Sequence, residues 1–523
     1  MNATETARRL VVHLLGCRVS DVVICPGSRS GPLARAFAAA DAQGLVRLHV
    51  RIDEREAAFL ALGMAKVTGR WTPVVTTSGT AAANLHPAML EAAHSGARLL
   101  AITADRPARL RGTGANQTTL QPGIFPQVPV VERVEDVGST LRGPEHLNLE
   151  LDEPLTEIRD WDFPVTGSSG RPDLDPEPTV LSPGPRTIVI AGDRSSRRAR
   201  QTAEAGNWPL IAEPSSGSRT GPALTSGRLL LGRPSLIDRV ERVISFGHST
   251  LGRATTALLS RDIEIVHVGD QSTFPIPAAP RVSFVDEVAV AGAANPAWLT
   301  EWQEADRVVT DAVQATLRTA GPEADPLRVA ASVWAAVPPE GLLVVGPSNP
   351  IRDLDLVAPP FPVGERRKVV ANRGLAGIDG VLSTAIGAAL GRRSSAALAY
   401  VGDLTFLHGS NGLLIGPDEP RPDLTIVVAN DDGGSIFAGL EQGAPEFADS
   451  FERVFATPTG AHLGSLCAAF GIAHERVDAA ALSDALATAA VGVRVVEVPV
   501  PRDARRRLSA AIVDACALRP MEE

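Results

Sequence analysis

Short apolar stretches rich in Val and Ile recur along the chain, and each ends in small or polar residues ahead of a helical pattern. Strands that alternate with helices in this way predict parallel sheets joined by crossover helices. Ligands of such sheets bind at the carboxyl ends of the strands, so the loops after the strands are the places to search for chemistry. In the first third of the chain the predicted strands cover residues 21–25, 47–52, 72–77 and 98–103.

Two further series of the same kind follow. Residues 134–186 are rich in Pro, Gly, Asp and Glu and have weak strand signals, which predicts a long connection between domains. A helix is expected around residues 298–318. The later predicted strands cover residues 187–193, 240–247, 263–270, 341–346, 368–371, 397–402, 424–429 and 493–498. The sequence therefore predicts an α/β protein with three doubly wound parallel-sheet domains, over residues 1–180, 181–325 and 326–523.

The composition narrows the class of protein. Hydrophobic residues make up 44% of the 523 residues and aromatic residues only 4%, which suits parallel strands packed with Ala, Val, Leu and Ile. A formal net charge of -10 argues against a non-specific nucleic-acid binder. The chain has no long apolar stretch, no signal-peptide pattern and no metal-type cysteine spacing. We expect a cytoplasmic protein with no membrane span and no nucleic-acid partner.

Oxygen-bearing side chains follow two successive predicted strands of the third domain. Gly402, Asp403 and Leu404 end the first of them, and Asp431, on a loop with a Gly-Gly turn, comes 28 positions after Asp403. Because neighbouring parallel strands end at one edge, these oxygens can hold Mg²⁺ that bridges to a diphosphate. The helix near Leu404 offers free amides to phosphate. The alternative is an ordinary turn and helix cap.

A carboxylate also stands at the end of a predicted strand in the first domain. Glu54 follows this strand and begins a helix. A thiamine cofactor acts only after its C2 carbon loses a proton, and a buried carboxyl group bound to ring nitrogen N1′ lets the aminopyrimidine remove that proton. The alternative is that Glu54 complements the helix dipole, which is the role we expect for Asp53 and Glu56.

Several motifs at these strand ends resemble those of thiamine-diphosphate-dependent enzymes. The pyrimidine-binding domain of that superfamily is similar to the chain at residues 26–30, 53–55 and 77–81. More narrowly, the chain resembles the 2-succinyl-5-enolpyruvyl-6-hydroxy-3-cyclohexene-1-carboxylate (SEPHCHC) synthase family of menaquinone biosynthesis at residues 103–107, 114–117, 348–352 and 372–380. The resemblance covers the first and third domains well and the middle domain loosely.

The resemblance implies a fold, a reaction and an assembly. The fold is of the thiamine-diphosphate-binding type, with a pyrimidine-binding, a central and a diphosphate-binding domain in that order. The implied reaction is decarboxylation of 2-oxoglutarate and 1,4-addition of the succinyl-semialdehyde carbanion to isochorismate, with thiamine diphosphate and Mg²⁺ as cofactors. The family works as a homodimer or homotetramer, with each active site between subunits.

Site residues carry over from the same resemblance. Glu54 resembles the catalytic carboxylate, and Asp403, Asp431 and the carbonyl of Gly433 resemble the Mg²⁺ ligands. Ile378 resembles the apolar wedge that keeps the cofactor bent. The other implied cofactor contacts are Gly402, Leu404 and Ile436. The implied substrate-binding residues are Ser28, Arg29, Arg106, Gln117, Ser348, Arg352 and Arg373.

The four arginines in this set suit the implied chemistry for an independent reason. Each substrate is a dicarboxylate, and the cofactor adds a diphosphate. A site for these groups needs cations with fixed, fork-shaped geometry, which arginine provides better than lysine. For any one of Arg29, Arg106, Arg352 and Arg373, a surface ion pair is the alternative.

Two departures from the superfamily pattern leave questions open. Asp431 stands where many members have Asn, and Asp432 follows it, so either carboxylate can be the metal ligand. Gly409 stands where an acidic residue is expected, and the sequence does not decide the consequence. Two functions compete with the implied one. They are another thiamine-diphosphate 2-oxo acid decarboxylase or carboligase, such as acetohydroxyacid synthase, and a non-catalytic regulatory homologue.

Overall fold

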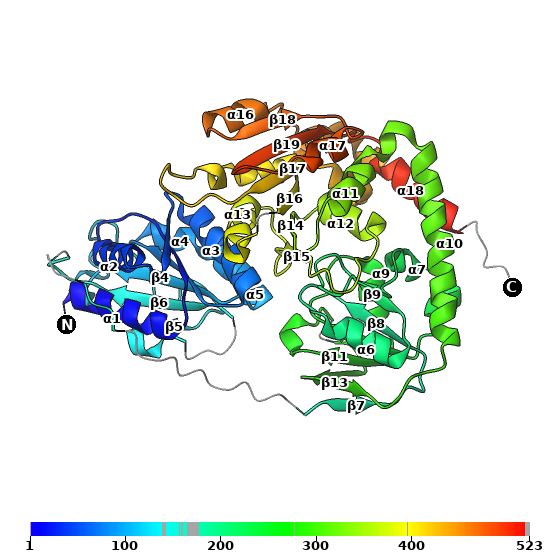
Figure 1. Cartoon of the computed structure of the whole chain (residues 1–523), viewed down its shortest axis with the longest axis horizontal. Helices are drawn as coiled ribbons and strands as arrows, with labels where there is room; N and C mark the ends of the chain where they lie inside the picture. The colour runs from blue at the N-terminus through cyan, green and yellow to red at the C-terminus, as the bar shows by residue number, and fades with distance from the viewer. Residues whose placement is uncertain are drawn as a thin grey trace.

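The computed structural model of the chain describes residues 2–138, 143–155, 157, 161–164, 177–276, 278–394 and 396–517. Its strands form three main sheets and one small sheet, and the described strand pairs in them are parallel. Figure 1 shows helices packed on these sheets, so the predicted α/β class is confirmed. We call the parts that carry the main sheets the first, central and third domains; their boundaries after residues 180 and 325 stay a prediction.

The first domain carries a six-stranded sheet. Its strands, in spatial order, are β2 (Arg47–Val50), β1 (Asp21–Ile24), β3 (Thr72–Thr76), β4 (Leu99–Asp105), β6 (Glu145–Glu150) and β5 (Val130–Val131). Its helices are α1 (Ala3–Gly16), α2 (Gly31–Ala42), α3 (Glu54–Thr68), α4 (Thr80–Asn84) and α5 (His86–Ser95).

The central domain carries a five-stranded sheet and a two-stranded one. The larger sheet has the order β12 (Val282–Val285), β11 (Glu264–Val268), β10 (Arg242–Phe246), β8 (Thr187–Ala191) and β9 (Leu210–Ala212), and the smaller pairs β13 (Val288–Val290) with β7 (Thr179–Leu181). Its helices are α6 (Arg198–Gly206), α7 (Gly227–Leu230), α8 (Pro234–Ile237), α9 (Arg253–Leu259) and the long α10 (Ala297–Thr319), which confirms the helix expected there.

The third domain carries another six-stranded sheet. Its order is β15 (Lys368–Ala371), β14 (Leu342–Val345), β16 (Ala397–Gly402), β17 (Leu424–Asn430), β19 (Val493–Pro499) and β18 (Ala473–Arg476). Its helices are α11 (Asp325–Ala335), α12 (Asn349–Val357), α13 (Val381–Arg392), α14 (Asp403–His408), α15 (Ala448–Phe451), α16 (Leu463–Ala469), α17 (Leu482–Ala487) and α18 (Arg505–Ala517). Because Gly402 pairs with Ala429, strands β16 and β17 end at the same edge, as the spacing predicted.

The predicted connection over residues 134–186 is wrong at β6, which lies inside the first sheet between β4 and β5. This strand is buried although it is rich in polar residues. Asn148 donates to Asp105 at 2.9 Å and accepts from Thr103 and Gln121 at 2.8 Å, while His146 bonds the Thr103 hydroxyl at 2.7 Å. Burial lowers the pKa of His146 to about 4, so its ring is neutral. Because these polar groups satisfy one another, hydrophobicity carries no strand signal here.

Glycines bring α3 of the first domain into direct contact with α13 of the third. A Cβ added at Gly63 would lie 2.1 Å from the carbonyl oxygen of Thr384, and one added at Gly387 would lie 2.0 Å from that of Leu60. The two helix backbones therefore touch, and this contact fixes the start of α3, with Glu54, against the third domain.

We expect Gly63→Ala to destabilise the protein by about 1–3 kcal/mol or more, because the new methyl group must push the two helices apart. The measurement is the thermal midpoint of unfolding. Gly16→Ala is the control, since a Cβ added there meets no heavy atom within 4 Å and alanine favours a helix. Equal midpoints for the two variants would show that the helices can separate without cost.

Candidate active site

A buried and a partly buried carboxylate meet at the shared end of β16 and β17. Asp403 is 3% exposed, and its Oδ2 accepts a hydrogen bond from the amide of Gly433 at 2.8 Å. Asp431 accepts a hydrogen bond from the Ser435 hydroxyl on Oδ2, while its Oδ1 is buried with no partner in the described part of the chain. Burial and then Asp431 raise the pKa of Asp403 to about 7, and burial raises the pKa of Asp431 to about 6.

This arrangement fits a divalent cation with oxygen ligands. Two neighbouring carboxylates with raised pKa values, one of them with an orphaned oxygen, gain from a cation between them. Among the described residues no group of three or more His, Cys, Asp and Glu side chains has metal-binding geometry. Two carboxylates and a backbone carbonyl, such as that of Gly433, therefore form the ligand set we expect.

The neighbouring Asp432 is engaged elsewhere. It is exposed, and its Oδ1 accepts hydrogen bonds from the amides of Thr459 at 3.1 Å and Gly460 at 3.0 Å. These bonds tie the loop of residues 430–434, here called the metal loop because it carries the predicted metal ligands, to the loop ahead of α16. Of the two candidate carboxylates, Asp431 is the one with a free buried oxygen, and this favours Asp431 as the ligand.

The other predicted cofactor contacts also lie in the third domain. Gly402 has no heavy atom within 4 Å of an added Cβ, so the space beside its backbone is open. Three apolar residues of this set are partly buried. Leu404 lies on α14, Ile378 lies on the loop ahead of α13, and Ile436 lies just after the metal loop. Gly409 ends α14 at φ -102°, which any residue can adopt, and an added Cβ would meet only ordinary contacts. Their roles toward a cofactor stay predictions.

Glu54 is the first residue of α3 and is partly exposed. Asp53 caps this helix by accepting hydrogen bonds from the amides of Arg55 and Glu56, which confirms its expected role at the helix N-terminus. The Glu54 carboxylate instead accepts a hydrogen bond from Asn84 at 3.1 Å and opens on a hollow of about 550 Å³. Asp53 therefore already caps the N-terminus of α3 and complements its dipole, while Glu54 faces an open cavity.

Glu56 departs from its expected role. It is 1% exposed, accepts a hydrogen bond from Ser383 of α13 at 2.6 Å, and burial raises its pKa to about 7. It therefore belongs to the contact between α3 and α13. Its identity as a charged residue next to Glu54 gave no sign of this burial.

The hydrogen bonds that join the start of α3 to the third domain here reach the last residue of α14 and the turn after it, away from Asp403. Arg55 donates to the carbonyl of His408 at 2.9 Å, and Asn411 donates to Asp53 at 2.9 Å. No hydrogen bond between described residues joins Glu54 to Asp403 or Asp431 within one chain.

The first pair of predicted substrate arginines lies after β1 and β4. Arg29 is 5% exposed and donates to the carbonyl of Leu151 at 3.0 Å, while Arg106 donates to the carbonyl of Asn116 at 2.8 Å. Each also has a buried Nε with no described partner. Burial lowers the pKa of Arg29 and the charge of Arg106 lowers it further, so two cations share this corner. Ser28 beside them is exposed.

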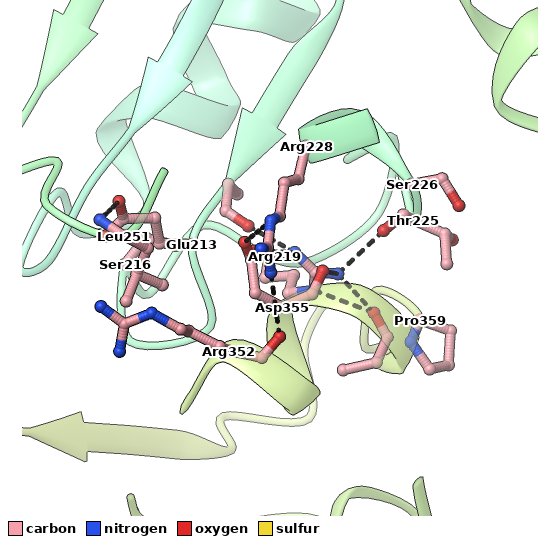
Figure 2. Close-up of polar contacts among 12 residues, drawn as sticks. Glu213, Ser216, Arg219, Thr225, Ser226, Arg228, Leu251, Arg352, Asp355 and Pro359 are labelled. Atoms are coloured by element: carbon pink, nitrogen blue, oxygen red, sulfur yellow. Dashed lines mark hydrogen bonds and ion pairs between the residues drawn. The ribbon is translucent and has the colours of Figure 1, made fainter. Parts of the chain in front are cut away.

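The second pair lies in the third domain, facing the central domain. Arg373 is 3% exposed, and Arg352 donates to the carbonyl of Ser348 at 2.7 Å. Burial and then Arg373 lower the pKa of Arg352. Figure 2 shows the Arg352 guanidinium directed toward Ser216 and Glu213, while Arg228 binds its carbonyl at 3.2 Å.

None of these four arginines has a carboxylate ion-pair partner within the described residues; their hydrogen bonds go to carbonyl and hydroxyl oxygens. The alternative role, a surface ion pair with a carboxylate, is therefore not observed for any of these four arginines. By contrast, the nearby Arg109 pairs with Asp152. Buried or partly buried cations without an ion-pair partner are suited to bind an anionic ligand.

Unusual backbone conformations occur in the same loops. Gln117 has φ 56°, Ser348 has φ 69° and Ala376, near Ile378, has φ 59°, all in the left-handed region that favours glycine. Gln117 also bonds the carbonyl of Ser78 through its Nε2 at 3.2 Å. Strain of this kind gathers at functional sites, because the surrounding structure must hold it. The described residues that contact the site and that the sequence did not single out are Asn84, Glu91, Glu213, Arg228 and Thr250.

Comparison with known proteins defines the class first. Residues 4–124 match the family model described as the thiamine pyrophosphate enzyme, N-terminal TPP binding domain. The structure is similar to a crystal structure of benzoylformate decarboxylase from Polynucleobacter necessarius, with a TM-score of 0.66 and 18% identity over 96% of this chain and 99% of that one, which supports the fold alone. The class is therefore that of the thiamine-diphosphate enzymes.

Relatives over the full length then define the family. A 2-succinyl-5-enolpyruvyl-6-hydroxy-3-cyclohexene-1-carboxylate synthase of Nocardioides sp. is 53% identical, over 99% of this chain and 98% of that protein. Synthases of the same name from Kineococcus radiotolerans and Saccharopolyspora erythraea are each 42% identical over 98% of this chain, covering 100% and 98% of those proteins. The chain belongs to the SEPHCHC synthase family, which confirms the resemblance.

Proposed function

We propose that the protein decarboxylates 2-oxoglutarate and adds the succinyl-semialdehyde unit to isochorismate, forming SEPHCHC and CO₂ for menaquinone biosynthesis. Family membership supports the reaction. The structural observation that carries it is a set of four arginines at the strand ends that have no carboxylate ion-pair partner among the described residues. Arg29 and Arg373 are buried, and Arg106 and Arg352 are partly buried. A reaction between two dicarboxylates needs these cations, whereas one that uses pyruvate needs fewer.

The cofactor site is part of the same proposal. Asp403, Asp431 and the carbonyl of Gly433 hold Mg²⁺, which anchors the diphosphate, and Ile378 supports the bent form of the cofactor. When bound, thiamine diphosphate supplies the carbon centre at which the 2-oxo acid loses CO₂. Glu54 shares a proton with the aminopyrimidine ring of the cofactor, and the arginines orient the substrate carboxylates.

We further propose that the active site forms between two copies of the chain, in a homodimer or homotetramer. The position of Glu54 supports this, since it opens on a cavity while the described contacts of its helix with α14 lie away from Asp403. Ile52 beside it is 71% exposed, as expected of a side chain that another copy covers. No described helix is long and apolar enough to cross a membrane. A cytoplasmic location stays a prediction.

The test is a reaction of the protein with isochorismate, 2-oxoglutarate, Mg²⁺ and thiamine diphosphate, with the product identified by mass. A parallel reaction replaces 2-oxoglutarate with pyruvate. We expect SEPHCHC in the first reaction and little turnover in the second. Preference for pyruvate would instead support an acetohydroxyacid synthase, and a lack of Mg²⁺-dependent cofactor binding by calorimetry would support a non-catalytic homologue.

We expect Arg352→Ala to lower kcat/KM for substrate by about 10- to 100-fold while leaving cofactor affinity unchanged, because it removes a charged hydrogen-bond donor to a carboxylate. Steady-state kinetics and cofactor calorimetry measure the two effects. Arg366→Ala is the matched control, since the Arg366 side chain is 80% exposed and its Nε lies 3.8 Å from the Glu340 carboxylate, a long ion pair at the surface. Loss of cofactor affinity with unchanged substrate kinetics would place Arg352 in the cofactor site.

A further inference from the structure

The side chain of Arg373 in the third domain is held by the central domain. Its Nε and Nη2 both donate to the hydroxyl oxygen of Thr250, at 3.2 Å and 2.6 Å. Thr250 lies in the loop that connects β10 to α9. Two donors on one acceptor fix both the position and the plane of the guanidinium group, because its donors form a rigid fork.

Glu213 holds the loop that carries Thr250. It directly follows β9, is 7% exposed, and its Oε1 accepts hydrogen bonds from the amides of Thr250 and Leu251, both at 3.0 Å. Figure 2 shows Glu213 beside Leu251. Burial raises the pKa of Glu213 to about 8, so at neutral pH this side chain is largely an uncharged acceptor of the two amides. The hydroxyl of Thr250 thus sits on a backbone that is itself anchored.

The backbone around Arg373 is held by the first domain. The carboxylate of Glu91 accepts the amides of Gly374 at 2.9 Å and Leu375 at 2.7 Å. Lys66 donates to Glu91 and to the carbonyl of Ala371, both at 2.9 Å. This ion pair is buried, and its bonds enclose the Arg373 backbone on both sides. Main chain and side chain of Arg373 are therefore fixed from two different domains.

The chemistry of the Thr250 contact leaves Arg373 free to act on an anion. Threonine is a neutral acceptor, so it orients the guanidinium group without cancelling its charge, as a carboxylate would. The remaining donor, Nη1, is buried and has no partner within the described residues. A buried, oriented and uncompensated N–H donor is what binding of a substrate carboxylate requires.

We infer that Thr250 is a positioning residue for Arg373, that Glu213 fixes the Thr250 loop, and that this is how the central domain takes part in the reaction. The inference rests on the proposed function, in which Arg373 binds a substrate carboxylate. Through this contact the central domain sets the geometry of a site formed by other domains.

The test compares three variants by steady-state kinetics with 2-oxoglutarate and isochorismate. Thr250→Val keeps the shape and removes the hydroxyl, and we expect it to raise the KM of one substrate by about tenfold with unchanged Mg²⁺ and thiamine diphosphate affinity. Thr250→Ser keeps the hydroxyl and is expected to restore the parent KM. Thr319→Val is the control, since the Thr319 hydroxyl bonds only carbonyls of its own helix. A parent-like KM for Thr250→Val, or no rescue by Ser, overturns the inference.

A double-mutant cycle separates this inference from the proposed function. In an Arg373→Ala background, Thr250→Val is expected to have no further effect on KM, because the guanidinium group that the Thr250 hydroxyl orients is already gone. Additive effects of the two substitutions would contradict the positioning role. If Arg373→Ala itself keeps the parent KM for both substrates, the proposed function of Arg373 fails. If Arg373→Ala is impaired and Thr250→Val is not, the inference about Thr250 alone fails.

Discussion

Glu54→Gln is expected to lower turnover by about 100- to 10,000-fold while the protein stays folded and binds its cofactor. Glutamine has the same shape, and its amide oxygen can still accept the hydrogen bond that Asn84 donates. It cannot share a proton with the aminopyrimidine ring, and that shared proton is the proposed role of Glu54. The measurements are kcat from product formation, and the affinity for thiamine diphosphate with Mg²⁺ from calorimetry.

Glu304→Gln is the matched control for this prediction. Glu304 is exposed on the long helix α10, so the same chemical change there should leave kcat at the parent value. Unchanged turnover in Glu54→Gln would exclude Glu54 from cofactor activation. Lost cofactor affinity with normal turnover at saturation would make Glu54 an anchor instead.

The parallel strands could be predicted because their burial leaves a direct trace in the sequence. Strands β15 and β16 begin and end at the predicted residues, since Val- and Ala-rich stretches bounded by Gly and polar residues have few other uses in an α/β fold. The edge formed by Asp403 and Asp431 followed from the same rule, because neighbouring parallel strands end together.

Strand β6 could not be predicted in this way. Its buried face is built from residues such as His146 and Asn148, whose partners come from β4 and from Gln121. A buried polar network has no hydrophobic period, and its members are recognisable only once the partners are in place. The polar composition of residues 134–186 therefore concealed a strand.

The support of Arg373 was equally out of reach. Thr250 and Glu91 lie 123 and 283 positions away from the residues that they hold, in other domains. A single threonine or glutamate in a loop has no spacing that indicates its partner. Sequence motifs predicted the groups that face the substrates, whereas the residues that orient these groups emerge only from the three-dimensional contacts.

Asp431→Ala is expected to weaken Mg²⁺-dependent binding of thiamine diphosphate by more than the roughly 10- to 100-fold typical of outer-shell changes, because it removes a proposed direct ligand of the cation. Asp431→Asn keeps one ligand oxygen and is expected to retain measurable binding. Calorimetric titration of thiamine diphosphate at several Mg²⁺ concentrations measures both effects.

Asp432→Ala is the adjacent control, and it decides between the two carboxylates. Because Asp432 already accepts the amides of Thr459 and Gly460, its loss should loosen that loop but leave the cation affinity close to the parent value. Asp431 has a buried oxygen without a partner and lies beside Asp403, whose pKa is raised by burial and by Asp431, so a cation relieves an unfavourable charge pair there. The opposite result is loss of Mg²⁺-dependent cofactor binding in Asp432→Ala and its retention in Asp431→Ala. It would make Asp432 the ligand and would require the metal loop to change conformation when the cofactor binds.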